Sequence, residues 1–260
     1  MSSIIEKLVN IKNGVLDISN QGLVELPDSP LWKGVKILYC QRNRLTQLPN
    51  LPNVTELSCY NNKLTYLPDL PNVKYLYCKN NKLTCLPDLS NVKELYCSYN
   101  ILTNLPYLPK IKELYCSNNK LTYLPDLPKV KYLCCQNNQL TNLPDLPNVK
   151  ALYCENNRLT YLPDLQNIKS LRCSNNQITR LPDLPNIKGL YCGNNPLIYK
   201  PKNRKVFNAI FRIISTQKMF KRWRLIVHRR RQERTYQIIN KVSEFDILPE
   251  ELKCHIINFI

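Results

Sequence analysis

The stretch "YCSNNKLTYLPDLPKVKYLCCQNNQLTNLPDLPNVKALYC", residues 115–154, contains the same phrase twice, 19 residues apart. A cysteine recurs nine times with this step, an asparagine follows each cysteine three residues later, and a Leu-Pro pair comes next. A weaker copy at residues 16–28 precedes the series, with 22 residues separating Leu16 from Leu38, so the chain holds about ten units. One such unit is too short to bury its apolar face alone and must stack on its neighbours. The period therefore predicts a solenoid.

Within each unit, the residue pattern predicts a short strand, a turn and an extended return. Apolar residues alternate with others around Leu114-Tyr115-Cys116, which is typical of a strand with one buried face. Two prolines in the second half of the unit exclude a helix there and favour a polyproline-like backbone. Stacked coils then form a parallel sheet whose strands lie about 4.8 Å apart.

The recurring asparagine suits the turn, because its amide both donates to and accepts from nearby backbone groups. We expect Asn43, Asn62, Asn81 and their successors to form a buried ladder. The nine recurring cysteines are expected to point inward with the leucines, since a free cysteine is a good small core residue.

A disulfide or metal role for the twelve cysteines is the alternative. It is disfavoured because C-x-x-C spacing is absent and the only near pair is Cys134-Cys135, whose side chains should point to opposite faces. The first residues, "MSSIIEKLVN", lack the basic start and long apolar run of a signal peptide, and no run approaches a membrane span. We therefore expect a reduced intracellular protein without metal or cofactor.

The unit V-K-x-L-Y-C-x-N-N-x-L-T-x-L-P-D-L-P-N resembles the leucine-rich repeat, L-x-x-L-x-L-x-x-N-x-L, with cysteine in the third leucine slot. Its short length and L-P-x-L-P tail resemble the repeats of bacterial effectors, and a similar pattern occurs in repeat proteins of giant DNA viruses. The resemblance covers residues 16–199. It implies an α/β-type solenoid with a curved parallel sheet, an extended convex side, and binding of a protein partner on the concave face.

Tyrosine dominates the outward strand position that would line this concave face, and a file of lysines flanks it. Tyrosine offers a large amphipathic contact area at small entropic cost, which favours partner binding. The alternative is that the tyrosines stack on one another and stabilise the sheet, while the lysines are merely solvated. The expected partner-binding residues are Tyr77, Tyr96, Tyr115, Tyr153, Arg172, Tyr191, Lys93, Lys112 and Lys131.

Residues that could support catalysis are scarce. The two histidines, His228 and His255, lie outside the repeats, and the aspartates recur on the return segments, away from any cleft. Five scattered glycines cannot form a phosphate-binding loop. The sequence predicts a protein that is not an enzyme.

The N-terminal segment, residues 1–15, is expected to be a capping helix over the open end of the solenoid. Ser3 and Glu6 form a capping-box pattern, and apolar residues from Ile4 to Ile11 have helical spacing.

Residues 200–243 contain fourteen Lys or Arg and a single acid, Glu233. Apolar residues at helical spacing predict a basic amphipathic helix. It could pack on the solenoid end, bind an acidic partner or import receptor, bind nucleic acid, or contact an anionic membrane. The basic patch comprises Arg222, Arg224, Arg229, Arg230 and Arg231.

Residues 244–260 contain "LPEELKCHIINFI", a short amphipathic helix that begins at a proline with acids in its first turn. It resembles the opening helix of an F-box, which docks on the Skp-type adaptor of cullin ubiquitin ligases. The chain stops where a second F-box helix should begin, so a plain capping helix is the alternative. The resemblance implies adaptor contacts at Leu248, Pro249, Leu252, Ile256 and Ile260.

Together these patterns predict a cytoplasmic leucine-rich-repeat interaction protein, located in the host cell if the gene is viral. The two alternative functions are a ubiquitin-ligase substrate receptor and a nucleic-acid-associated protein, and a nuclear location is the alternative to the cytoplasmic one.

Overall fold

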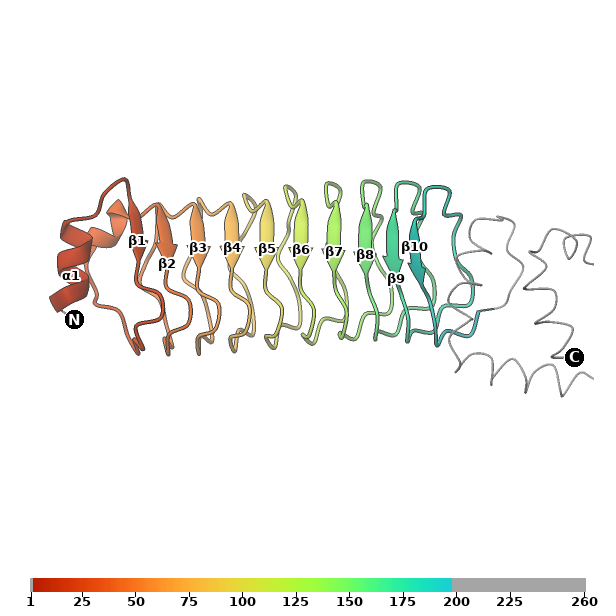
Figure 1. Ribbon diagram of the computed structural model, residues 1–260, viewed down its shortest axis with the longest axis horizontal. Coiled ribbons are helices and arrows are strands. Elements are labelled where there is room, and N and C mark those ends of the chain that lie inside the picture. The colour runs from red at the N-terminus through yellow and green to blue at the C-terminus, as the bar shows by residue number, and fades with distance from the viewer. Residues whose placement is uncertain (1, 198–260) are drawn as a thin grey trace, which may run out of the picture. The chain divides into compact units, whose positions relative to one another are not determined.

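The computed structural model describes residues 2–197, which form a single parallel sheet with one strand per coil (Figure 1). Its ten strands follow one another in chain order, and each pairs in parallel with the next. The strands are β1 (Val15–Asp17), β2 (Ile37–Tyr39), β3 (Glu56–Ser58), β4 (Tyr75–Tyr77), β5 (Glu94–Tyr96), β6 (Glu113–Tyr115), β7 (Tyr132–Cys134), β8 (Ala151–Tyr153), β9 (Ser170–Arg172) and β10 (Gly189–Tyr191).

Register is uniform, because equivalent residues of successive repeats always face one another. Leu95 pairs with Leu114, and Tyr96 pairs with Tyr115. The central leucine of every strand points inward and is at most 3% exposed. The following cysteine, from Cys40 to Cys192, is equally buried. The leucines of the Leu-Pro returns close the core from the other side. The inward cysteines and leucines are confirmed.

Each strand ends in a turn that depends on a left-handed residue. The second residue after the cysteine has φ near +57° in all nine coils, and it is asparagine in seven of them. Asparagine tolerates this conformation better than most residues do. Several of these amides also bond one another across coils, as from Asn137 Nδ2 to Asn118 Oδ1 at 3.0 Å.

The next asparagine joins neighbouring coils through their backbones. Asn119 Nδ2 donates to Cys97 O and to Cys116 O, each at 3.1 Å, and its Oδ1 accepts from Leu102 N at 3.0 Å. The equivalent residues Asn62, Asn81, Asn100, Asn138, Asn157, Asn176 and Asn195 repeat this pattern. The expected row of asparagines therefore exists. Its members are linked through hydrogen bonds to backbone groups and not by hydrogen bonds between their side-chain amides.

At the N-terminal end, α1 (Ser2–Val9) contacts η1 (Pro30–Gly34), a short 3-10 helix inside the longer first unit. Ile4 and Leu8 of α1 are buried, so the helix covers the first coil, as Figure 1 shows. Trp32 of η1 is 2% exposed, and its Nε1 donates to Pro27 O at 2.9 Å. The helix is shorter than the sequence predicted. The apolar series continues to Ile11, whereas α1 ends at Val9.

Between residues 2 and 197, no helix is long and apolar enough to cross a membrane, and no group of three His, Cys, Asp or Glu side chains could hold a metal ion. The basic segment 200–243 and the F-box-like segment 244–260 lie outside the described residues. Their expected adaptor contacts and basic patch therefore stay predictions.

Candidate interaction surface

The outward side of the sheet is built from the first and third residue of each strand, since the central leucine points inward. In β2 to β10 the third positions form the tyrosine column: Tyr39, Ser58, Tyr77, Tyr96, Tyr115, Cys134, Tyr153, Arg172 and Tyr191. In the same nine strands the first positions form the inner file: Ile37, Glu56, Tyr75, Glu94, Glu113, Tyr132, Ala151, Ser170 and Gly189. We call the two files together the sheet face. The structure brings all the predicted tyrosines and Arg172 onto it.

Three tyrosines of β4, β5 and β6 stack on one another. The ring centroids of Tyr77 and Tyr96 lie 5.0 Å apart with a tilt of 35°, and those of Tyr96 and Tyr115 lie 4.3 Å apart at 13°. All three side chains are half-buried. The stacking alternative considered from the sequence is therefore present, and it leaves each of the three tyrosines partly exposed to solvent.

Carboxylates lie beside this stack in the inner file. Glu94 and Glu113 occupy paired positions on β5 and β6, and Tyr96 donates its hydroxyl proton to Glu113 Oε2 at 3.3 Å. Burial and the nearby Glu113 charge raise the pKa of Glu94, and burial and neighbouring carboxylates raise the pKa of Tyr77 to about 12. The phenols are therefore neutral hydrogen-bond donors at physiological pH, and carboxylates lie beside them on this part of the face.

Arg172 interrupts the column between two tyrosines. Its guanidinium carbon lies 5.0 Å from the ring centroid of Tyr153 and 5.0 Å from that of Tyr191. A cation between two aromatic rings is attracted by both ring faces. Arg172 and Tyr191 remain exposed to solvent.

Cys134 occupies the column position on β7 and divides the column into two groups of tyrosines. It points outward, as expected, yet it is only 8% exposed because larger neighbours flank it. Burial raises the pKa of its thiol to about 11, so the thiol is protonated at neutral pH.

The lysine file borders the strand starts and consists of Lys36, Lys74, Lys93, Lys112, Lys131, Lys150, Lys169 and Lys188. Successive members are linked by backbone hydrogen bonds, as from Lys112 N to Lys93 O at 2.7 Å and from Lys131 N to Lys112 O at 2.8 Å. These bonds continue the sheet by one residue, so the lysines share its spacing. All are exposed except Lys93, which is half-buried.

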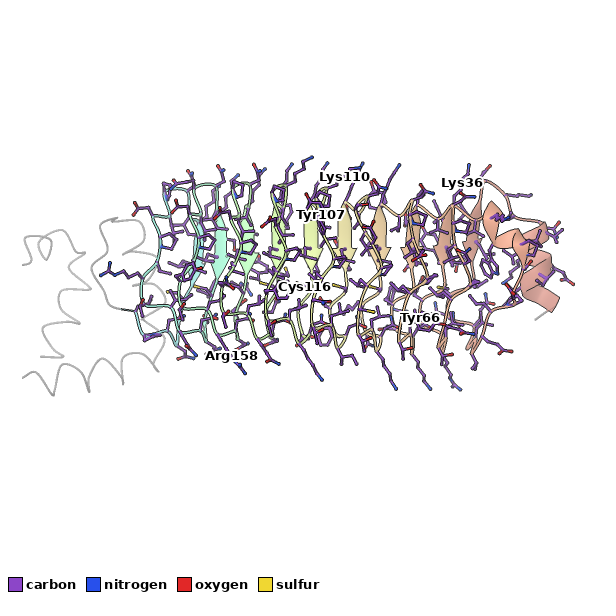
Figure 2. All side chains as sticks on the ribbon, turned by 180° about the vertical axis from the view of Figure 1, so that it is seen from behind. Lys36, Tyr66, Tyr107, Lys110, Cys116 and Arg158 are labelled. Carbon is purple, nitrogen blue, oxygen red and sulfur yellow. The ribbon has the colours of Figure 1, made fainter. Side chains whose placement is uncertain are left out.

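Sequence reasoning missed a second set of tyrosines on the edge where the strands end. Tyr66, Tyr123 and Tyr161 occupy the same repeat slot, and each is about half exposed, at 48%, 51% and 54%. Figure 2 shows Tyr66 and Arg158 toward this edge, and Lys36 and Lys110 on the opposite one. The recurrence of tyrosine in the T-Y-L-P tetrapeptide was the signal that could have identified this set.

The nine recurring cysteines, from Cys40 to Cys192, offer no exposed nucleophile. Cys116 lies inside the coils (Figure 2) and is 0% exposed, and burial raises its pKa well above the usual value. The same cause raises the pKa of Cys40 and of Cys78 to about 12. A thiol without thiolate character is a poor nucleophile and a poor metal ligand.

Comparison with known proteins agrees with this geometry. A family model described as leucine-rich repeats in two copies matches residues 52–91 and 90–129. The leucine-rich effector YopM from Yersinia pestis is 35% identical, with a TM-score of 0.68, over 78% of this chain and 60% of that chain. The functional domain of InlJ from Listeria monocytogenes, which includes a cysteine ladder, is 30% identical with a TM-score of 0.65, over 75% and 47% of the two chains.

A Shigella effector leucine-rich-repeat domain is 27% identical with a TM-score of 0.51, over 84% of this chain and 82% of that one. Curated protein sequences give no significant match. One short parallel strand per coil, an asparagine-bridged turn and an extended return define the protein as a leucine-rich-repeat solenoid. Its 19-residue repeats are those of the bacterial-effector type, of which YopM is an example. The chain spans 60% of the length of YopM and 47% of that of InlJ. The fold is that of a protein-interaction scaffold.

Proposed function

We propose that this protein is a non-catalytic scaffold that binds a protein partner on the sheet face, the concave side implied by the repeat type. The observation that carries the proposal is the tyrosine column. It presents six tyrosines and one arginine on nine successive strands, side by side and partly open to solvent.

The core does not require tyrosine at these positions. Ser58 and Cys134 occupy the same slot with unchanged strand register, and their central leucines are as buried as those beside tyrosine. Outward residues of a solenoid are free to vary without disturbing the coils, so their side chains reflect binding more than folding. Tyrosine and arginine are also the residue types that dominate binding hot spots.

Stacking and binding are compatible in this column. Rings that are already ordered by their neighbours lose little conformational entropy when a partner covers them. The stack of Tyr77, Tyr96 and Tyr115 is thus a preorganised, half-exposed contact surface. Lys93, Lys112 and Lys131, beside it, contribute to steering an acidic partner more than to affinity.

The proposal can be tested by capture of partners from extracts of the cells in which the protein acts. A triple variant with serine at Tyr77, Tyr96 and Tyr115 removes the stack but keeps a side chain that Ser58 shows to be acceptable there. The matched control places serine at Tyr66, Tyr123 and Tyr161, three tyrosines on the strand-end edge.

We expect the sheet-face variant to lose the captured partner and the edge variant to retain it, with both variants folded by circular dichroism. Equal capture by the two variants, or loss only in the edge variant, would place the interface elsewhere and contradict the proposal.

Two further functions rest on residues beyond 197. The motif at Leu248-Pro249 supports a ubiquitin-ligase substrate receptor, in which residues 244–260 bind a Skp-type adaptor while the repeats hold the substrate. The charge of residues 200–243 supports association with nucleic acid. We propose a cytoplasmic location, in the host cell if the gene is viral, and a nuclear one if the basic segment acts as an import signal.

A further inference from the structure

The column slot on β9 departs from the residue types found at the other eight column positions. Its other members are tyrosine, serine or cysteine, and Arg172 is its only cation. An arginine on an outward strand position adds charge without adding to the core. Arg172 therefore places a positive charge at this point of the sheet face.

The two neighbouring rings fix the position of that charge. Tyr153 and Tyr191 hold the guanidinium from the strands on either side, at 5.0 Å from each centroid. An arginine that is already held in place loses less freedom on binding than a free side chain does. Because Arg172 stays exposed, its planar donors can meet a ligand from solvent.

The surroundings of Arg172 leave room for a ligand. The inner-file residues of β8, β9 and β10 are Ala151, Ser170 and Gly189, in contrast to the glutamates and tyrosines of β3 to β7. A Cβ added to Gly189 would meet no atom closer than Ser170 Oγ at 3.9 Å. The inner-file side chains beside Arg172 are therefore small and uncharged.

Positive charge dominates this end. Lys150, Lys169 and Lys188 border it and are exposed. Glu155 is the acid on which the Arg172 charge acts: burial raises the pKa of its carboxyl, and Arg172 lowers it by a smaller amount. Among the described residues, Glu155 Oε2 is buried and accepts no hydrogen bond.

The middle of the sheet face carries carboxylates as well as lysines, because Glu94 and Glu113 lie side by side on β5 and β6, next to Lys93 and Lys112. A nucleic-acid strand laid along the whole face would bring its phosphates against these carboxylates. A polypeptide can instead carry an acid at one point and a base at another. Charge complementarity therefore favours a polypeptide segment with both signs.

We infer that Arg172, held between Tyr153 and Tyr191, anchors a carboxylate of an acidic segment of a protein partner. The inference rests on the proposed function and names the chemistry of the partner. Three strand spacings separate Arg172 from Glu113, or about 14 Å at about 4.8 Å each. An extended chain covers that distance in about four residues. The segment thus carries Asp or Glu over β9 and Lys or Arg about four residues away.

The test uses the full chain and synthetic probes. The first probe is a twelve-residue Gly/Ser peptide with two Glu, two Lys about four residues further on, and a benzophenone photo-crosslinker. The second probe replaces Glu by Gln, and the third is a twelve-nucleotide oligo-dT with the same crosslinker. Mass spectrometry locates each crosslink, which separates the strands from the basic segment 200–243.

We expect the Glu/Lys probe to crosslink on β8–β10 in the wild type, and the Gln probe to crosslink there much less. Arg172→Gln should reduce the crosslinking at least about tenfold, since a charged hydrogen bond is lost. Arg172→Tyr should do the same while restoring the repeat, which protects the test from misfolding. Arg158→Gln, at an exposed arginine on the strand-end edge, should change nothing.

Crosslinks on β8–β10 that persist in both Arg172 variants, or that fall only on residues 200–260, would overturn the inference. Stronger crosslinking of oligo-dT on β8–β10, abolished by Arg172→Gln, would assign the site to nucleic acid instead. The capture experiment on Tyr77, Tyr96 and Tyr115 does not depend on Arg172, so it decides the proposed function separately.

Discussion

Asn119 bonds two coils at once, because its Nδ2 donates to Cys97 O of the preceding coil and to Cys116 O of its own, each at 3.1 Å. Its Oδ1 accepts from Leu102 N at 3.0 Å. One side chain thus satisfies three backbone groups that the turn would otherwise leave unpaired.

Replacing Asn119 by alanine should lower the free energy of unfolding by about 1–3 kcal/mol, because it leaves partly buried backbone groups without their partner. Urea unfolding followed by circular dichroism measures the loss. Lys120→Ala, at an exposed neighbour, is the control and should change little. Equal midpoints for the two variants would show that water replaces the amide at no cost.

The core cysteines should resist thiol reagents in the folded protein. Cys97, Cys116 and Cys135 are each 0% exposed, whereas Cys85 is exposed. Iodoacetamide followed by peptide mass spectrometry should modify Cys85 quickly and the other three only after denaturant is added. Rapid labelling of all four would contradict the core assignment.

Cys116→Ser should destabilise the solenoid by about 1–3 kcal/mol, because it places an unpaired hydroxyl in an apolar slot. Urea unfolding of the variant against the wild type gives the value. Cys85→Ser changes the same atoms at an exposed position and is expected to be neutral. A neutral effect at both positions would mean that residue 116 finds a hydrogen-bond partner.

The free energy of unfolding should fall as the pH rises from about 9 to about 12. Burial raises the pKa of Cys40 and Cys78 from 9.0 to about 12, and that of Tyr77 from 10.0 to about 12. Between these values the unfolded chain loses protons that the folded chain keeps, so ionisation favours unfolding. The stabilisation is complete below about pH 9 and is lost as pH approaches 12. Urea midpoints across this range measure it, and Cys78→Ala should weaken the dependence. A flat profile in the wild type would contradict the burial effect.

The hypothesis that residues 244–260 bind a Skp-type adaptor predicts the effect of a deletion. Removing residues 245–260 should abolish adaptor binding and leave the repeats folded. Titration of the purified adaptor against the full chain and the deletion variant tests it. Absence of binding by the full chain at micromolar concentration removes the hypothesis. A drop in solenoid stability on deletion would instead favour a capping helix.

The basic segment should make any duplex-DNA binding salt-dependent, with a slope near −0.9 per neutralised phosphate. Joint replacement of Arg229, Arg230 and Arg231 by alanine should flatten that slope by up to about three units. Serine at Tyr96, Tyr115 and Tyr153 should leave it unaltered, because stacking releases few counterions. An unchanged slope in the arginine variant would favour a protein partner for this charge.

The sequence by itself determined the solenoid, the strand positions, the inward cysteines and the asparagine turns, because a 19-residue period leaves each unit dependent on identical neighbours. It also predicted which residues line the sheet face. It did not reveal η1, because Trp32 becomes buried only when the first coil packs against α1.

Only the tertiary structure decided how the side chains of neighbouring coils pack against one another. Parallel pairing places residues 19 positions apart in contact, so Tyr96 stacks on Tyr115, and Arg172 lies between two rings. These contacts depend on side-chain rotamers, which adjacent strands restrict and which no single repeat specifies. Cys134 is buried for the same reason, although it points outward. The repeat determines which residues meet, and the packing between coils determines how they meet.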